Sequence, residues 1–163
     1  MKISPLSKED FSDILEMYNE PDSNKYIRPL WNKTEAEFIQ FFEKKLMQNK
    51  IENGLGFWVA RQIPSGEFIG TANLNFFFNT ERIQVGCHLS NRFWNKGFAT
   101  TILKELLNHG FKDKQLPKIY AFFEADNIAS KKALIKLGFI RLAEERHFDV
   151  DLQVYKLDKE TWI

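Results

Sequence analysis

A change in hydrophobic periodicity near residue 91 constrains the fold more than any other feature of the chain. Residues 83–90 alternate apolar and polar side chains, whereas residues 99–111 repeat apolar side chains at helical spacing. Alternation with a period of two predicts a half-buried strand, and recurrence every three or four residues predicts an amphipathic helix. A strand, a loop and a helix therefore follow one another here, which is typical of α/β domains.

Further helices and strands are expected on both sides of this unit. Two helices should precede residue 52, the first with Ser7 as its N-cap and Asp10 at its third position. A β meander and then a β-α-β-α-β-β order should follow. The expected helices are 8–20, 33–51, 98–111 and 128–137, and the expected strands are 57–60, 68–78, 82–90, 117–123, 139–142 and 148–157. This order predicts an α/β fold with a mixed sheet and flanking helices.

Composition narrows the class of protein. A length of 163 residues with 44% apolar side chains predicts one folded domain over residues 1–163. A net charge of +1 argues against a nucleic-acid partner, and the lack of an 18-residue apolar run argues against a membrane span. The single cysteine, Cys87, cannot form an internal disulfide, and no signal peptide is evident, so we expect a cytoplasmic protein.

The loop at residues 94–100 has the features of an anion-binding site. It reads Trp-Asn-Lys-Gly-Phe-Ala-Thr and leads into the amphipathic helix. A helix N-terminus offers unpaired N–H groups and partial positive charge, which suit a phosphate. Gly97 permits close backbone approach, and Ala99 keeps the first turn uncluttered. The loop matches neither a dinucleotide fingerprint nor a Walker loop, and on its own it also fits an ordinary strand-to-helix turn.

Three more segments accompany this loop in a recognisable order. Val-Gly-Cys-His-Leu stands at 85–89, Asn-Ile-Ala-Ser at 127–130 and Lys-Leu-Gly-Phe at 136–139. Together with the loop they resemble the GNAT superfamily of N-acetyltransferases, and within it the RimJ/RimL-like branch. The resemblance covers nearly the whole chain and is strongest from 83 to 140. It implies a GNAT-like, mostly antiparallel central sheet that is splayed at the acetyl-CoA site.

The resemblance implies acetyl-CoA as cosubstrate and indicates where it binds. The pyrophosphate would lie on the backbone amides of 95–100, and the pantetheine arm beside 88–90, where that strand diverges from 119–123. Lys96, Lys131 and Lys136 could approach phosphates or simply form solvated helix faces. The implied donor-site residues are His88, Leu89, Ser90, Asn95, Lys96, Gly97, Phe98, Ala99, Thr100, Asn127 and Ser130. The sequence contains no Cys/His cluster with the spacing of metal ligands, so we expect no metal site.

The sequence departs from the family at the positions of its acid and base. Gln84 stands where the branch often has a glutamate, and a glutamine cannot accept a proton at neutral pH. Leu134 stands where many GNAT enzymes have a tyrosine acid. Asn95 replaces the usual first glycine of the loop, and asparagine tolerates left-handed backbone angles. Cys87 is expected to be a buried apolar residue on the opposite strand face.

Three other residues are candidates for catalysis. His88 shares the strand face of Gln84, and its unperturbed pKa suits a base near neutrality. Glu124 ends a strand beside the expected gap, and Ser130 could donate toward the leaving sulfur. Each has a structural alternative: a histidine in the cleft wall, a surface carboxylate and an ordinary first-turn serine. His109 and His147 have no partner that the sequence identifies.

The missing acid and base favour an acceptor amine of low pKa. An α-amine with a pKa of about 8 is roughly 10% neutral at pH 7, whereas deprotonating a lysine costs about 4.6 kcal/mol. A leaving thiol with a pKa of about 8.5 needs little help from an acid. Positioning and donors to the oxyanion can supply much of the rate. The sequence therefore predicts direct acetyl transfer to a protein or peptide N-terminal α-amine.

The acceptor side is less defined. Residues before 55 should form helices over the acceptor cleft, with Tyr26, Trp31, Phe76 and Phe78 as candidate lining residues and Phe77 facing away. Each of these could instead belong to the core. A small-molecule amine is the alternative acceptor, and a non-catalytic acyl-CoA-binding regulatory module is the alternative function. Monomer and homodimer both remain open.

Overall fold

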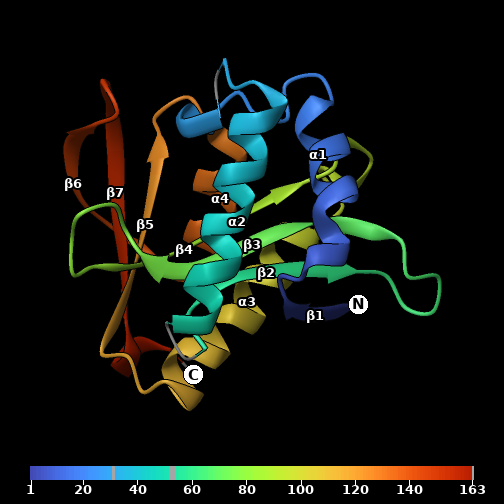
Figure 1. Ribbon diagram of the computed structural model, residues 1–163. Coiled ribbons are helices and arrows are strands. Elements are labelled where there is room, and N and C mark those ends of the chain that lie inside the picture. Colours follow the sequence, from blue (N-terminus) through green and yellow to red (C-terminus); the bar gives the residue numbers. More distant parts are fainter. Residues whose placement is uncertain (31, 52–53, 163) are drawn as a thin grey trace.

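The computed structural model describes residues 1–30, 32–51 and 54–162, and a seven-stranded sheet forms its centre (Figure 1). The strands are β1 (Lys2–Pro5), β2 (Gly56–Arg61), β3 (Phe68–Phe76), β4 (Ile83–Leu89), β5 (Lys118–Glu124), β6 (Ile140–His147) and β7 (Val150–Asp158). They lie in the order β1-β2-β3-β4-β5-β7-β6, and every neighbouring pair is antiparallel except β4 with β5. The predicted mixed, mostly antiparallel sheet is confirmed.

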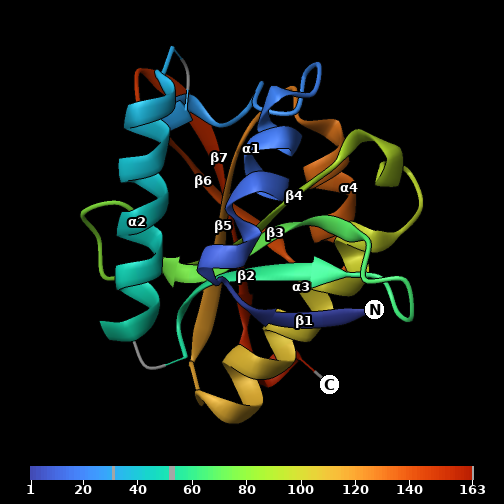
Figure 2. The ribbon, with the colours of Figure 1, turned by 45° about the vertical axis from the view of Figure 1, so that its right-hand side comes forward.

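Helices cover both faces of this sheet. They are α1 (Phe11–Asn19), α2 (Glu35–Ile51), α3 (Phe98–Asn108) and α4 (Ile128–Lys136). Figures 1 and 2 show α1 and α2 on one face, with α3 on the other. None of the helices in the described ranges is long and apolar enough to cross a membrane. The fold class with flanking helices agrees with the expectation from the sequence.

Each face of the sheet has its own apolar core. On the α3 side, Leu106 packs in one cluster with Val85 of β4. On the α1–α2 side, Phe38 packs in a second cluster with Val59 of β2. Val85 therefore faces α3, while His88 on the same strand lies against a tyrosine of α1. The alternation predicted for residues 83–90 is confirmed. Their apolar side chains lie on the α3 side of the sheet, and their polar side chains lie on the side of α1 and α2.

β4 and β5 meet at a single register position, where Gln84 pairs with Tyr120 in parallel. Beyond it the two strands diverge, so the backbone groups of 86–89 on this edge have no partner in β5. The splayed sheet expected from the family resemblance is therefore present. It opens a gap in the middle of the sheet, between two halves that are otherwise fully paired.

Two sheet elements differ from the sequence prediction. β1 was not expected, because the strand has only four residues and ends at Pro5. A proline is typical of an edge strand, and β1 lies at the edge of the sheet. β6 extends to His147 instead of ending at 142, and the β6–β7 turn falls on Phe148 and Asp149. Both turn residues have left-handed φ angles, 53° and 60°. Asn-Gly pairs usually signal such a turn, so this one was missed.

The caps of α4 form as predicted. Asn127 Oδ1 accepts a hydrogen bond of 3.1 Å from the Ser130 N–H at the start of the helix. At its end Gly138 has a φ of 91°, and the Phe139 N–H donates to the Leu134 carbonyl at 3.1 Å. This is the bonding of a Schellman motif, which needs the left-handed residue that glycine supplies. The cap fixes the start of α4 beside the end of β5.

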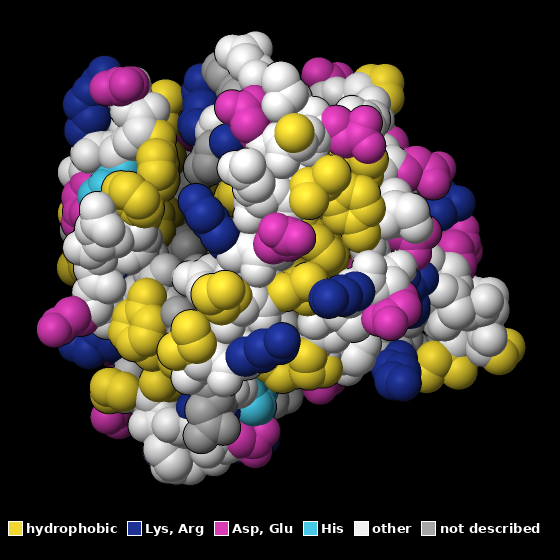
Figure 3. All heavy atoms as spheres, in the orientation of Figure 1, with side chains coloured by type: hydrophobic (Ala, Val, Ile, Leu, Met, Phe, Trp, Pro, Cys, Tyr) yellow, Lys and Arg dark blue, Asp and Glu magenta, His cyan; other side chains and the backbone are white. Residues whose placement is uncertain are grey.

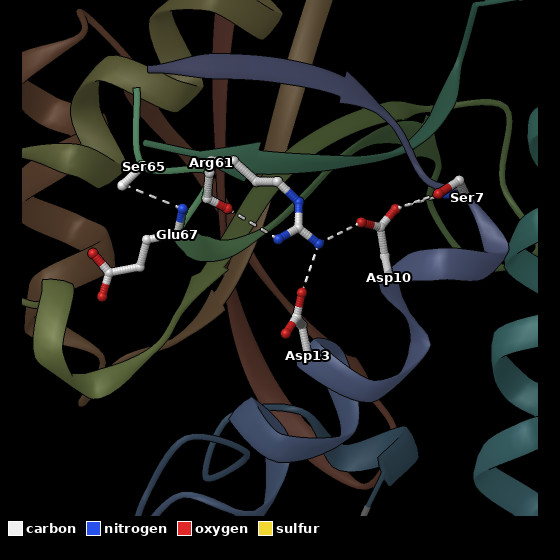
Figure 4. A network of polar contacts seen from close by, with 7 residues as sticks. Ser7, Asp10, Asp13, Arg61, Ser65 and Glu67 are labelled. Carbon is white, nitrogen blue, oxygen red and sulfur yellow. Dashed lines mark hydrogen bonds and ion pairs between the residues drawn. The ribbon is translucent and has the colours of Figure 1, made fainter. Parts of the chain in front are cut away.

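Arg61 ties the start of α1 to the β2–β3 hairpin (Figure 4). Its Nη2 donates to Asp10 at 2.7 Å and to Asp13 at 2.6 Å, and its Nη1 donates to the Gly66 carbonyl at 3.2 Å. Asp10 is 6% exposed, and its other oxygen accepts from the N–H and hydroxyl of Ser7. Ser7 is an N-cap with Asp10 at the third position, as predicted, but it caps a short turn that precedes the helix. A short 3-10 turn at Lys8–Asp10 precedes α1, which begins at Phe11.

Replacing Arg61 should destabilise the fold. Arg61→Met leaves the buried Asp10 carboxylate without its cation, and we expect a loss of about 2 kcal/mol in the free energy of unfolding. The matched control is Arg92→Met, which breaks an exposed pair with Glu67 and should cost about 0.5 kcal/mol or less. Urea unfolding measures both. Equal losses in the two variants would contradict the structural role given to Arg61.

Candidate active site

The N-terminus of α3 is open, and no side chain in the described ranges forms a capping hydrogen bond to it. Gly97 is its N-cap with a φ of 82°, and the first bond of the helix runs from the Thr101 N–H to the Gly97 carbonyl at 3.2 Å. The N–H groups of Phe98 to Thr100 precede this bond and point out of the helix end. A Cβ placed on Gly97 would meet nothing within 4 Å. This geometry fits a phosphate group.

The loop before this helix is held by contacts that the sequence did not reveal. Asn95 has a φ of 57°, which confirms that asparagine can replace glycine there. Trp94 Nε1 donates to the Leu89 carbonyl at 2.8 Å. Glu20, at the end of α1, accepts from the Ser90 hydroxyl at 2.6 Å and from the Asn91 N–H at 2.5 Å. These contacts hold the loop and the end of β4 against α1.

Ser90 has no polar group left for a ligand. Its hydroxyl is bound to Glu20, its N–H donates to the Ile69 carbonyl at 3.0 Å, and its carbonyl accepts from the Phe93 N–H at 2.9 Å. The residue is 2% exposed. Ser90 was expected beside the pantetheine arm, and these contacts indicate that it shapes the end of β4. His88 and Leu89 lie next to it on the edge of β4 that faces the gap.

His88 lies under α1 and is neutral in the fold. Its ring centroid is 6.3 Å from that of Tyr18, edge to face. Burial of the imidazole, and secondarily the charge of Lys45, lower the pKa of His88 to about 3. A group with so low a pKa is a weak general base and removes a proton from an ammonium acceptor poorly. We expected His88 to be a base that titrates near neutrality, and burial moves its pKa below that range.

Amide side chains form the polar floor beside the gap. Gln84 lies opposite Asn75 of β3, and Asn73 donates from Nδ2 to Asn75 Oδ1 at 2.8 Å. Gly86 lies opposite Asn73, whose Oδ1 would be 2.9 Å from a Cβ placed on Gly86. The sequence reasoning missed Asn73 and Asn75, although alternation along β3 would have placed them on this face. The floor can donate and accept hydrogen bonds but carries no charge.

Glu124 is engaged by an arginine from the segment between α1 and α2. Arg28 donates from Nε to Oε1 at 2.7 Å and from Nη2 to Oε2 at 2.5 Å. Beside this pair, the Tyr26 hydroxyl donates to the Asp126 carbonyl at 3.3 Å, and Lys25 forms an ion pair with the Asp126 carboxylate at 3.8 Å. The segment 25–28 is thus docked on the end of β5. Glu124 is not a free carboxylate.

Aromatic rings line the β5 side of the cleft. Phe77 stacks on Phe122 with centroids 3.6 Å apart, and the Arg82 guanidinium lies 4.8 Å from the Phe122 centroid. Phe77 is buried in this wall, whereas Phe76 and Phe78 are 43% and 61% exposed. Phe77 does point opposite to its two neighbours, but the expectation that it faces away from the cleft is wrong, because Phe77 is the one that stacks on Phe122. Figure 3 shows that the surface is hollowed between α2 and the strands β5 to β7, with hydrophobic side chains on the side of the strands. Trp31, another predicted lining residue, lies outside the described residues.

The remaining candidates divide between core and surface. Leu134 is 2% exposed within the α3-side core and has no proton to give. Cys87 packs against the same core as predicted, and burial raises the pKa of its thiol to about 12. Ser130 is half-buried at the first turn of α4, near the cap of Asn127. The three lysines considered for phosphate contacts, Lys96, Lys131 and Lys136, are exposed.

Two histidines that the sequence left without partners are engaged in local contacts. His109 hydrogen-bonds to Asp113 at 2.8 Å and to the Gly54 carbonyl at 2.7 Å. His147 contacts Glu145 at 3.0 Å and lies edge to face against Phe77. His109 therefore has a structural position away from the gap, while His147 belongs to the aromatic wall.

Known proteins share both the fold and the sequence pattern. The structure superposes on an acetyltransferase of the GNAT family from Bacillus anthracis with a TM-score of 0.81 and 21% identity, over 97% of this chain and 94% of that chain. A ribosomal-protein-S5-alanine acetyltransferase from Vibrio fischeri gives 0.75 at 19% identity, over 99% and 94%. A variant of the spermidine N-acetyltransferase SpeG from Vibrio cholerae gives 0.78 at 18% identity, over 100% and 98%. These likenesses show the fold.

Sequence comparison extends this result. The uncharacterized N-acetyltransferase YjdG of Bacillus subtilis is 28% identical over 151 residues, covering 90% of this chain and 86% of the relative. The family described as "Acetyltransferase (GNAT) domain" matches residues 1–140, which include the polar floor, the split strands, the open helix N-terminus and α4. The chain belongs to the GNAT acetyltransferase family, whose members transfer an acetyl group from acetyl-CoA.

Proposed function

We propose that the chain is an N-acetyltransferase of the RimJ/RimL-like branch that acetylates the N-terminal α-amine of a protein or peptide. The observation that carries the proposal is the open N-terminus of α3 beside the gap between β4 and β5. The Vibrio fischeri neighbour, whose title names a ribosomal-protein alanine as its target, supports this acceptor class. We extend the proposal to a single domain over residues 1–163 in the cytoplasm, as a monomer or homodimer.

The residues around the gap fit acetyl-CoA. The amides of 95–100 would hold the pyrophosphate, because the space above Gly97 is open and no side chain caps the helix. The edge of β4 at His88 and Leu89, which has no partner in β5, would hold the pantetheine amides, although the Leu89 carbonyl already accepts from Trp94. Asn127 uses Oδ1 in its cap, so its Nδ2 is the group that faces a ligand. Acetyl-CoA supplies an acetyl thioester, which is activated toward amines.

The acceptor amine must reach this thioester without its proton. Gln84 carries no charge, His88 is a very weak base, and Glu124 is paired with Arg28. The amide of Gln84 can instead orient a neutral amine. Backbone N–H groups on the free edge of β4 can donate to the oxyanion as the amine attacks. Ser130 is the group available to donate toward the leaving sulfur.

Two other functions are separated from this proposal by one assay. A non-catalytic acyl-CoA-binding module would bind acetyl-CoA and release no thiol with any amine. An enzyme for a small-molecule amine would prefer that amine to every peptide. The Vibrio cholerae neighbour is named for spermidine, so polyamines belong in the comparison.

We expect peptides with a free α-amine to be the better substrates. By the pKa difference alone, an α-amine should react about two hundredfold faster than a lysine side chain. The assay follows thiol release with a lysine-free peptide and with an N-terminally blocked peptide that contains one lysine. Faster release with the blocked peptide would reject the N-terminal acceptor. Binding of acetyl-CoA without release from any amine would favour the regulatory module.

Gly97→Val should abolish tight binding of acetyl-CoA. The added side chain would fill the space above the loop and block the approach of the pyrophosphate. Gly66→Val is the matched control, because Gly66 also has a left-handed φ with open space around it, and it lies in the β2–β3 turn. Calorimetric titration should show at least about a tenfold weaker Kd for Gly97→Val only. Equal binding by both variants would remove the donor site from this loop.

His88 should make stability depend on acid pH. Its pKa of about 3 in the fold lies below the ordinary value of 6.5, so only the unfolded chain takes up a proton between these values. This contribution is complete above pH 6.5 and is lost as the pH falls toward 3, by at most about 1.4 kcal/mol per pH unit.

Urea unfolding of the protein and of His88→Asn from pH 7 to pH 4.5 tests this dependence. The variant should show the flatter profile, because it lacks the buried imidazole. Parallel profiles would contradict the burial of His88. An inflection of kcat/KM near pH 6.5 that disappears in His88→Asn would instead identify His88 as the base.

A further inference from the structure

Among the three strands at the gap, one carboxylate lies on the face that meets the acceptor. β3, β4 and β5 are described in full, and Glu124 is the single acidic residue among them. Along β5, Tyr120, Phe122 and Glu124 alternate with Ile119, Ala121 and Phe123, which lie in the α3-side core. Glu124 therefore lies on the acceptor face, in line with the two aromatic rings.

Arg28 neutralises this carboxylate. Two parallel hydrogen bonds of 2.7 and 2.5 Å join the guanidinium to both oxygens of Glu124, and the side chains are 27% and 13% exposed. The planar fork of an arginine matches a carboxylate in this way, whereas a lysine acts as a point charge. The pair presents no net negative charge to a ligand in the cleft.

The other charges near the aromatic rings are also paired or positive. Beside Phe122, Arg82 donates to both oxygens of Glu145 at 2.8 and 2.7 Å, and Glu145 lies level with Glu124 because both pair with Leu152 of β7. Lys45 of α2 lies 4.5 Å from the ring centroids of Phe41 and Phe57 and is the charge that lowers the pKa of His88. Glu124 and Glu145 are thus each paired with an arginine near the rings of β5.

We infer that Arg28 is a specificity residue: by occupying Glu124 it excludes polyamines and selects an amine with one positive charge on an apolar or aromatic body. This inference rests on the proposed acetyltransferase function. The second ammonium group of a polyamine would lose its hydration on entering the cleft, and it would find no unpaired carboxylate on β3 to β5 to compensate for that loss. The aromatic side chains of β5 instead favour an apolar group next to the amine. The shared fold with a spermidine N-acetyltransferase does not decide this, because the fold leaves the charges of the cleft open.

The inference predicts a gain of function when Arg28 is removed. Arg28→Gln frees the Glu124 carboxylate, so the ratio of kcat/KM for spermidine to that for phenethylamine should rise about fivefold or more. Arg28→Lys keeps a cation beside Glu124 and should change this ratio much less. The double variant Arg28→Gln/Glu124→Gln removes the freed carboxylate and should return the ratio toward that of the unchanged protein.

Binding provides a second readout if a variant turns over too slowly. Calorimetric titration of spermidine and of phenethylamine into each variant with CoA present should show the same change in ratio. Thermal shifts with acetyl-CoA verify that the variants are folded and keep the donor site. An unchanged ratio in Arg28→Gln, or a preference for spermidine in the unchanged protein, would overturn the inference. Absence of turnover with every amine in the unchanged protein, with acetyl-CoA bound, would instead reject the proposed function.

Discussion

The divergence of β4 from β5 is the constraint on which the rest of the structure depends. Inner strands of a sheet normally pair their backbone groups on both edges, because a buried unpaired N–H or C=O is costly. Here the two strands share one paired position, Gln84 with Tyr120. The free edge beyond it must be satisfied by water or a ligand, so a split of this kind persists only where the surrounding packing holds both halves in place.

That packing differs on the two faces. On the closed face, α3 and α4 join residues of both halves in one apolar cluster that includes Val85, Ile119 and Leu134. On the open face the halves are joined by polar contacts, with Glu20 holding the end of β4 and Arg28 holding the end of β5. A dry core therefore fixes the gap from behind, while hydrogen bonds and ion pairs leave its front accessible to a ligand.

The sequence predicted the parts of the site that depend on local rules. The open helix N-terminus follows from Gly97, the α4 caps from Asn127 and Gly138, and the inward faces of the strands from alternation. The ion pair of Arg28 with Glu124 could not be predicted, because the two residues are 96 positions apart in the sequence. The residues around each of them contain no pattern that identifies the other as its partner. The low pKa of His88 also depends on its packing in the fold, which no local pattern contains.

Two properties of the described part of the cleft, the lowered pKa of His88 and the pairing of Glu124 with Arg28, have a common consequence for the acceptor. A carboxylate near an amine stabilises its ammonium form, whereas apolar surroundings and nearby cations favour the neutral form. Lys45 shows this effect within the protein itself, because burial between aromatic rings lowers its pKa to about 8. An acceptor amine entering beside the aromatic rings of β5 experiences the same kind of environment. If Arg28 selects the acceptor as we propose, its pairing with Glu124 would serve catalysis as well as selectivity, because the cleft would then favour the neutral form of the nucleophile.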